Sequence, residues 1–398
     1  MIEFKTAGES HGKGLVTIVS GFPSNLKILP GYIDQQLKRR QAGYGRGPRM
    51  KIESDQVEII SGIRFAKTIG SPISMIIWNK DWQNWKDILS IEESIYANEK
   101  ISIPRPGHAD LVGSIKYNYN DIRNSIERSS ARETAARVAA CTVARRFLEE
   151  FGIYIGSYVE SIGGVTGKNN LDPFATSKIN IKRISNEADK SPVRVLDKEH
   201  EEKIIRKIKS AKKKGDTLGG TFYIIATGVP VGLGSFASFN SRLDADLSHA
   251  IMSINAVKGV EIGDGFNSAS KFGSEVHDEI ILKNNQITRR SNRAGGIEGG
   301  ISNGMPIVIR AAMKPIATLM NPISTIDLHK FKSVEARRER SDFVAVPACS
   351  VIAESMTAWV LAKRFLEKFG GDSIEETRDN YNNYMHKIYS RLKKNFAK

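Results

Sequence analysis

A nine-residue segment occurs twice in this chain, and its repetition limits the folds that the chain can adopt. Residues 144–152 read ARRFLEEFG, and residues 362–370 read AKRFLEKFG. Two Gly-x-Pro turns also recur in the same order, with copies at 21–23 and 228–230 and at 70–72 and 304–306. Each signal is weak alone, but three matched signals in one order indicate a diverged duplication.

The spacing of apolar residues predicts what each half contains. Apolar residues recur at helical spacing over Glu133–Phe151 and Val346–Phe369, on a broad face that indicates close burial. Apolar runs beside the turns predict strands at Gly14–Ser20, Ile73–Trp78, Thr221–Thr227 and Ile307–Ala312. Shorter helices are expected at 30–40 and 243–254. A loop-rich region is expected at 164–197.

We therefore expect one domain over residues 1–398, of the α+β class. Its two halves, at about 1–155 and 215–371, would pack around a pseudo-twofold axis as a β-α-β sandwich, with the long helices between antiparallel sheets. Residues 372–398 would form a charged helical tail.

The chain is strongly basic, with 59 Lys and Arg against 44 Asp and Glu and a formal net charge of +15. Such an excess could bind nucleic acid, attract an anionic metabolite into a basic pocket, or lie on a solvated surface. Lys203–Lys214 favours the last reading for part of the excess, because it is typical of the end of an exposed helix that Gly215 stops. The arginines in glycine-rich tracts have no such explanation.

Cysteine content and hydropathy indicate a cytoplasmic protein with no membrane partner. Cys141 and Cys349 are the only cysteines and lie in apolar, helix-like stretches, so neither a disulfide framework nor a metal site is expected. The first residues lack the apolar region of a signal peptide. The most apolar long stretch, Val344–Ala362, contains Pro347 and Glu354, which argues against a membrane-spanning helix.

Two histidines lie in polar tracts bounded by glycine: His11 in AGESHG and His108 in RPGHAD. Histidine gives and takes protons near neutral pH, although a lone histidine in a turn is more often structural. Ser10 could hold a phosphate oxygen or orient the His11 ring, and Asp110 could orient His108 or cap the following turn. His277 could lie near a site. The other four histidines are interpreted as structural. His249 and His329 lie in helix-like or ordinary polar settings, and His200 and His386 lie among surface charges.

Arginines cluster in tracts rich in glycine and serine. GYGRG at 43–47 could be a flexible basic loop or an RNA-binding segment. ERSSARE at 127–133 precedes the first long helix, where Ser129 or Ser130 can cap the helix and also help to seat a phosphate. AGGIEGG at 294–300 could face a flat ring or form a turn. Because arginine binds phosphate and carboxylate, these tracts indicate proton transfer on a small polyanion.

The order and the amino-acid sequences of these tracts resemble those of the chorismate synthase family. The resemblance runs from about Phe4 to about Phe369 and is carried by GESHG, RRQAGYGRGPRM, RPGHADLVG, ERSSARETAARVAA, INAVKGVEIGDGF, AGGIEGGISNG and RSDFVAVPA. It implies a lyase that forms chorismate by 1,4-anti elimination of phosphate from 5-enolpyruvylshikimate 3-phosphate, and that requires reduced FMN without net redox change. It also implies a homotetrameric β-α-β sandwich, and some members reduce their own flavin with NADPH.

The resemblance further implies roles for individual residues. His11 would protonate the departing phosphate. His108 would protonate the reduced flavin or keep it in its reactive state, and Asp342 would assist near flavin N5. The substrate's phosphate and carboxylates would be held by Ser10, Arg40, Arg46, Arg105, Arg132 and Arg340. The FMN pocket would be formed by Arg128, Ser129, Ser130, Asn255, Ala256, Gly299, Lys314, Pro315, Ile316, Ala317, Thr318 and Arg340.

Two other functions are alternatives to this one. A flavin oxidoreductase would turn over NADPH. A basic RNA-binding protein would show salt-sensitive affinity for nucleic acid and no need for FMN.

Overall fold

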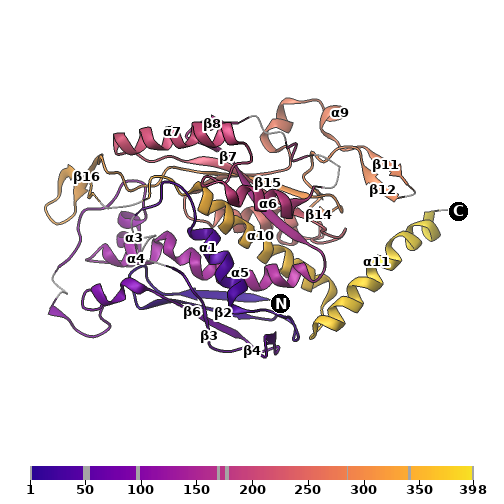
Figure 1. Cartoon of the computed structure of the whole chain (residues 1–398), viewed down its shortest axis with the longest axis horizontal. Coiled ribbons are helices and arrows are strands. Elements are labelled where there is room, and N and C mark those ends of the chain that lie inside the picture. Colours follow the sequence, from indigo (N-terminus) through magenta and orange to yellow (C-terminus); the bar gives the residue numbers. More distant parts are fainter. Residues whose placement is uncertain are drawn as a thin grey trace.

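The structure is a computed structural model and describes residues 2–47, 54–95, 99–167, 171–174, 179–284, 286–338 and 342–396. Two antiparallel sheets enclose a layer of long helices (Figure 1). The expectation of an α+β fold is confirmed, and the long helices lie between the sheets.

The first sheet has the strand order β3-β6-β2-β1. Its strands are β1 (Glu3–Ala7), β2 (Gly14–Ser20), β3 (Glu58–Ile59) and β6 (Ile73–Trp78). Leu15 lies opposite Ile77, and Val19 lies opposite Ile73. These side chains are buried whereas Ile18 is 48% exposed, so one face of the sheet packs on the helices.

The second sheet has the strand order β10-β15-β9-β7-β8. Its strands are β7 (Tyr154–Ile162), β8 (Val165–Thr166), β9 (Gly220–Thr227), β10 (Val257–Ile262) and β15 (Ile307–Met313). Ile224 on β9 lies opposite Ile309 on β15, and both side chains are buried in the main core. The four strands expected from the sequence are all present, with ends that differ by at most one residue.

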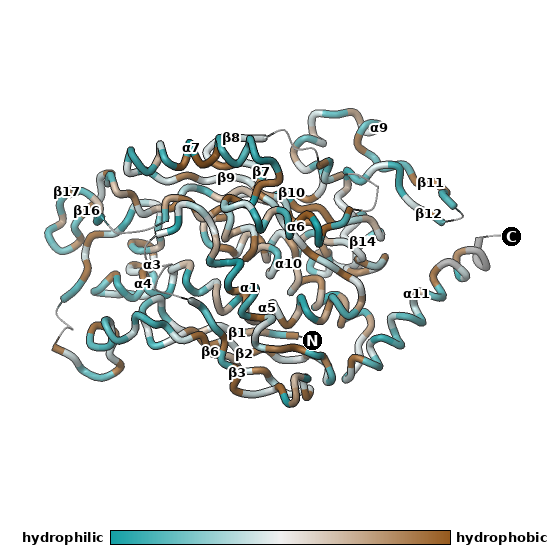
Figure 2. The backbone as a smooth tube through the Cα atoms, viewed as in Figure 1, coloured by the Kyte–Doolittle hydropathy of each residue, from teal (hydrophilic) through white to brown (hydrophobic). Residues whose placement is uncertain are grey.

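The inner layer contains α1 (Pro30–Gln41), α5 (Thr134–Glu149), α8 (Leu243–Met252) and α10 (Val346–Phe369). α5 packs on the first sheet and on α10, and α10 packs on β7 and β9 of the second sheet. Both long helices are buried around most of their circumference. Figure 2 shows hydrophobic segments gathered in this interior, whereas the exposed side of the C-terminal helix α11 (Ile374–Phe396) is mostly hydrophilic.

Smaller elements surround this core. α3 (Asp110–Tyr117) and α4 (Arg123–Ser129) lie at one end, and α7 (Lys198–Lys214) lies beside the second sheet and ends at left-handed Gly215, as expected (Figure 1). The other short elements are η1 (Lys80–Asn84), η3 (Ala131–Glu133), η4 (Phe239–Ser241), η5 (Gly265–Ser270), α9 (Gly273–Val276), and the hairpins β4–β5 (Ile63–Arg64, Lys67–Thr68), β11–β12 (Ile280–Lys283, Gln286–Arg289), β13–β14 (Ile297–Glu298, Ile301–Ser302) and β16–β17 (Ser324–Asp327, Lys332–Glu335). None of the helices in the described part of the chain is long and apolar enough to cross a membrane.

Two expectations need correction. The stretch 164–197 is not all loop, because α6 (Ile181–Lys190) forms there and packs on β7. Ile181, Ile184 and Ala188 recur at helical spacing and pack together, in a short pattern that lies among polar residues. His200 does not lie on the surface. Its side chain is buried beneath β8, with Nε2 3.3 Å from the carbonyl oxygen of Val165.

Candidate active site

His11 lies in the turn between β1 and β2, where a carboxylate and an indole hold its ring. Nδ1 is 2.9 and 3.0 Å from the two carboxylate oxygens of Glu127, and the His11 backbone N–H donates to the same carboxylate at 2.8 Å. The imidazole also stacks on Trp85 at 4.0 Å between ring centroids. Because Glu127 is almost fully buried, its charge acts on His11 with little screening.

Arg40 and Arg132 lie side by side beneath this turn, with Asp55 between them. Arg132 donates to Asp55 at 2.5 Å and to the Asn79 side chain at 2.9 Å, and Arg40 lies 3.5 Å from the other oxygen of Asp55. Asn79 in turn donates to the carbonyl oxygen of Gly12 at 2.7 Å. The arginines and the His11 turn therefore form one connected structure.

Helix ends place both arginines. Arg40 is in the last turn of α1 with Lys38 and Arg39, where cations favour the helix dipole, and its guanidinium reaches Thr134 at 3.0 Å. Ser130 caps the turn before α5 by accepting the backbone N–H of Arg132, as one reading of the sequence expected. Burial lowers the pKa of Arg40 to about 10 although Asp55 opposes the shift, so Arg40 still carries its charge at neutral pH.

His108 has a carboxylate partner of its own. Its Nδ1 lies 2.5 Å from Asp110, and Arg105 donates to both oxygens of Asp110 at 2.8 and 3.1 Å. Burial alone would raise the pKa of Asp110, but hydrogen bonds from His108 and Arg105 outweigh burial and hold the pKa well below its usual range. Asp110 therefore orients His108, and it also begins α3.

The segment 314–318 lies against the His108 turn. Lys314 Nζ donates to the carbonyl oxygen of Gly107 at 2.5 Å, and Thr318 Oγ1 lies 3.5 Å from Arg105. The backbone N–H of Lys314 donates to Ala256 at 2.9 Å, and the neighbouring Asn255 donates through its amide to the carbonyl oxygen of Ser129 at 3.0 Å. Most of the predicted FMN residues are therefore brought together.

Arg128 and Ser129 complete this side of the site. The half-exposed guanidinium of Arg128 donates to the carbonyl oxygens of Thr6 and Gly8 at 3.1 and 3.4 Å. Ser129 donates back to Ser125 in α4. The predicted FMN residues of this tract thus lie directly beside the strand that leads to His11.

Arg46 and Asp342 form a further pair. Asp342 lies 3.3 Å from the Arg46 guanidinium and accepts the backbone N–H of Gly47 at 2.5 Å. The charges of Arg46 and Asp342 also act on Arg40, which places this pair beside the buried arginines. Arg340, predicted to touch both substrate and flavin, lies outside the described residues.

Gly299 is not brought to the other predicted residues within this chain. It turns the β13–β14 hairpin, whose next residue, Gly300, accepts the backbone N–H of Leu243 at the start of α8. Asn255 follows the far end of the same helix. At ~1.5 Å per residue, this ten-residue helix separates the two positions by ~15 Å.

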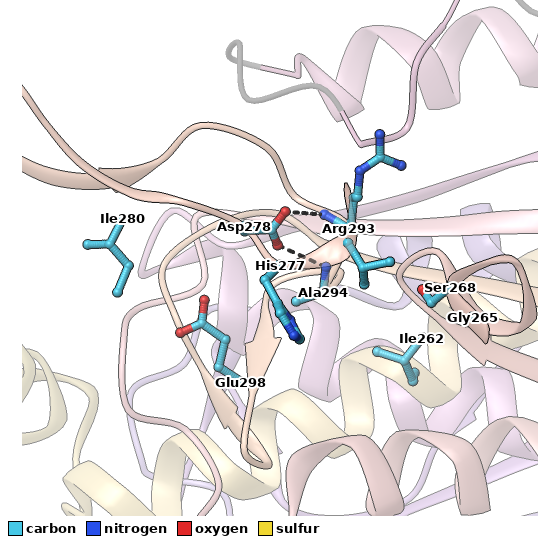
Figure 3. A pocket seen from close by; sticks show the side chains of 10 residues that line it. Ile262, Gly265, Ser268, His277, Asp278, Ile280, Arg293, Ala294 and Glu298 are labelled. Atoms are coloured by element: carbon cyan, nitrogen blue, oxygen red, sulfur yellow. Dashed lines mark hydrogen bonds between the residues drawn. The ribbon is translucent and has the colours of Figure 1, made fainter. Parts of the chain in front are cut away.

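His277 lies at a separate hollow of about 340 Å³, which contains none of the predicted site residues (Figure 3). Asp278 beside it accepts the backbone N–H groups of Arg293 and Ala294 at 2.8 and 2.9 Å. Glu298 also lines this hollow and pairs with Arg289 at 2.7 Å. The structure therefore does not place His277 among the residues around His11 and His108.

The site contains functional residues that sequence reasoning missed: Asp55, Asn79, Trp85 and Glu127. Glu127 stands at the start of the quoted tract ERSSARE but received no role. Single charged residues make no periodic pattern, and Glu127 meets His11 across 116 positions of sequence. Only the three-dimensional structure makes these pairings visible.

Two imidazoles held through Nδ1 by carboxylates, beside several guanidinium groups, can move protons next to a bound polyanion.

The chain matches the family model described as chorismate synthase over residues 2–366. It is 54% identical over 390 residues to the chorismate synthase of Chloroherpeton thalassium, covering 97% of this chain and 100% of that protein. It is 50% identical to that of Aquifex aeolicus, covering 98% of each.

Comparison with a solved structure points to the same family. The fold matches a crystal structure of chorismate synthase with a TM-score of 0.79 and 42% sequence identity, over 98% of both chains. Sequence and fold agree over nearly the full length. The chain therefore belongs to the chorismate synthase family.

Proposed function

We propose that this chain eliminates phosphate from 5-enolpyruvylshikimate 3-phosphate to give chorismate, as its family does, with reduced FMN bound and no net redox change. The observation that carries the proposal is the pair of histidines, each held through Nδ1 by a buried carboxylate, with Arg105 in contact with His108 and Arg132 linked to the His11 turn through Asn79. Neither RNA binding nor net flavin oxidation explains this arrangement.

The arginines are suited to hold the substrate's anionic groups. Arg40 and Arg132 share the charge of one carboxylate, Asp55, so the group retains positive charge for a phosphate or carboxylate. Arg46 and Arg105 would contribute beside them. Each guanidinium is held by an acidic side chain, which reduces the freedom lost when substrate binds.

His11 would donate a proton to the phosphate as its bond to carbon breaks. With Nδ1 engaged by Glu127, the ring exchanges protons with a ligand through Nε2. Ser10 beside it is buried and would orient the same phosphate. General-acid help of this kind contributes ~10²–10⁴ in rate.

The residues around Asn255 fit a flavin. Its side-chain oxygen is buried and accepts no hydrogen bond from the described residues, so it can take an N–H or O–H of a bound group. FMN would be held by Arg128, Ser129, Ser130, Ala256 and the segment 314–318, in which Arg128 and Lys314 supply positive charge for an anionic cofactor. Reduced FMN supplies the transient electron donation that the elimination needs.

His108 and Asp342 would manage protons beside the flavin. His108, oriented by Asp110, would keep the bound cofactor in its reactive protonation state. Asp342 would serve as a proton acceptor next to Arg46, which holds its carboxylate in place. Arg340 and Gly299 would complete the set.

Fold symmetry, assembly and compartment also belong to this proposal. The neighbouring strands β2 and β6 in the first sheet and β9 and β15 in the second pair in the same antiparallel manner, which supports a duplicated fold with halves near 1–155 and 215–371. A homotetramer in the cytoplasm fits the family. Two buried, unpaired cysteines agree with a reducing compartment.

An anaerobic assay tests the proposal. Purified protein, chemically reduced FMN and the enolpyruvyl substrate should release phosphate and chorismate in equal amounts. A second arm with oxidised FMN and NADPH tests whether the chain reduces its own flavin. Absence of phosphate release with reduced flavin would overturn the proposal.

A further inference from the structure

We propose that Glu127 is a positioning residue for His11: it fixes the orientation and the tautomer of the imidazole through Nδ1. The inference rests on the proposed function, in which His11 is the acid that protonates the departing phosphate. Glu127 touches neither substrate nor cofactor in this scheme and acts only through His11.

Glu127 of α4 contacts both the ring and the backbone of the His11 turn. Both carboxylate oxygens of Glu127 lie within 3.0 Å of Nδ1, and one of them also accepts the His11 backbone N–H at 2.8 Å. The backbone carbonyl oxygen of Glu127 accepts the N–H of Ser10 at 3.1 Å. One residue therefore fixes the backbone and the ring of the acid together.

This geometry fixes the tautomer of His11. An ionised carboxylate can only accept hydrogen bonds, so Nδ1 keeps its proton in both the neutral and the charged ring. The proton that His11 gives away must then leave from Nε2. Trp85, stacked on one face at an interplanar angle of 25°, limits rotation of the ring.

Comparison with the second histidine distinguishes their roles. Asp110 divides its charge between His108 and Arg105, which donates to both of its oxygens. Glu127 forms no ion pair with Lys or Arg within the described ranges, and both of its carboxylate oxygens contact Nδ1 of His11. Glu127 therefore orients one imidazole, whereas Asp110 holds a histidine and an arginine together.

The test replaces the charge and keeps the shape. Glu127→Gln retains a hydrogen-bond acceptor but removes the charge, and we expect kcat to fall about 100-fold or more, within the range that a general acid contributes. KM for the enolpyruvyl substrate and the affinity for FMN should change less than about threefold, because Glu127 contacts neither ligand. Glu127→Asp should recover part of the lost kcat, since it restores the charge at a greater distance.

The matched control is Glu201→Gln. Glu201 is equally a buried glutamate, but it lies on α7 and pairs with Lys198. This variant should retain the wild-type kcat and KM. A Glu127→Gln protein that binds FMN and keeps full kcat, or that loses only substrate affinity, would overturn the proposal.

A spectroscopic measurement on the wild-type protein keeps the inference testable if Glu127→Gln does not fold. The Nδ1 proton shared with a buried carboxylate should give a proton resonance far downfield of the backbone amides. His11→Gln should remove that resonance, and a spectrum unchanged by this substitution would contradict the pairing. A wild-type protein that shows the resonance but releases no phosphate would instead contradict the proposed function.

Discussion

Asp55 is the residue that makes two buried arginines possible in the candidate site. Its side chain is fully buried and lies between Arg40 and Arg132, at 3.5 and 2.5 Å. Burying a cation without a counter-charge is strongly unfavourable, so removal of one partner costs more than the pair itself contributes. Asp55 therefore affects both stability and substrate binding.

Replacing Asp55 with Asn should lower the free energy of unfolding by about 3–5 kcal/mol, because two buried guanidinium groups lose their anion. Denaturant titration at pH 7 measures this change. Asp87→Asn, on an exposed carboxylate, is the control and should change stability by less than about 0.5 kcal/mol. An equal effect of both substitutions would show that the arginines do not depend on Asp55.

Replacing Arg46 with Ala should weaken substrate binding more than flavin binding. Arg46 lies beside Asp342 and close enough to Arg40 for their charges to interact, whereas the residues proposed for FMN lie around Asn255. We expect the substrate KM to rise by about 10-fold or more, the loss of ~1.4 kcal/mol or more that a charged hydrogen bond provides. Kinetic titration and flavin fluorescence measure the two affinities, and an equal loss of both would mean that Arg46 contacts the cofactor.

The sequence was most informative where a reactive residue lies in an unusual local context. His11, His108 and Arg132 stand out because glycine, serine and arginine surround them. Asp55 and Glu127 do not, because an isolated acidic residue has the same appearance on a surface as in a buried pair. Asp55 meets Arg40 across 15 positions and Arg132 across 77, and Glu127 meets His11 across 116, so no local pattern connects them.

At the scale of elements, Glu354 joins the inner helices to the second sheet. It lies in the middle of α10 with no exposure, and its carboxylate accepts from guanidinium groups of Arg39, Arg145 and Arg194. Burial alone would raise the pKa of Glu354, but these positive charges outweigh burial and hold the pKa well below its usual range. α1, α5, α10 and the segment before α7 therefore meet at one charged centre.

This centre predicts how stability depends on pH. A carboxyl group whose pKa is lower in the folded state contributes stability above its unfolded pKa of ~4.3, and that contribution is lost as pH falls toward the folded pKa. Glu354→Gln should therefore be less stable than the wild type by about 3–5 kcal/mol at pH 7. The difference should shrink below about pH 4, and denaturant titrations at pH 7, 5 and 3.5 measure it. A difference that stays constant would exclude this role.

The long helices and the main strands could be predicted because burial on a periodic face leaves a pattern in the sequence. α10 begins and ends at the expected residues, and β2 and β6 match as well. α6 is harder to predict, because its apolar pattern of Ile181, Ile184 and Ala188 is short and lies within a polar stretch. The position of Gly299 relative to Asn255 also depends on packing of α8, which no local signal encodes.

Among the side chains that the structure describes in the C-terminal helix α11, those of its first half pack on the aromatic core. Tyr381 contacts Phe151, Phe365 and Phe369 at 5.3–5.5 Å between ring centroids, and the helix then leads away from the body (Figure 1). A chain ending at Gly371 should lose about 2–5 kcal/mol of stability, the scale of burying one or two large side chains. A chain ending at Met385 keeps the aromatic contacts and should match the full chain. Thermal unfolding of the two truncations distinguishes these outcomes.

At the scale of the whole molecule, the candidate site accounts for little of the net charge of +15. There, Arg40, Arg46, Arg105 and Arg132 contact Asp55, Asp342 or Asp110. Most of the excess positive charge therefore lies over the rest of the molecule, where it can attract an anionic substrate over a distance.

This distribution predicts a salt dependence. Raising the ionic strength from about 0.05 to 0.5 M shortens the range of electrostatic attraction severalfold, so kcat/KM should fall by a factor of about 3–10. The value of kcat at saturating substrate should stay within about twofold, because the paired groups inside the site are screened much less. Steady-state assays across this salt range measure both constants, and a parallel loss of kcat would show that salt acts on the chemical step.

The stacking of Trp85 on His11 gives the molecule an internal optical probe. An excited indole loses its emission far more readily to a charged imidazole than to a neutral one. Light emitted by this tryptophan should therefore brighten when the neighbouring ring surrenders its proton and dim when the proton returns. Stopped-flow fluorescence could then follow when this one imidazole loses and regains its proton during turnover.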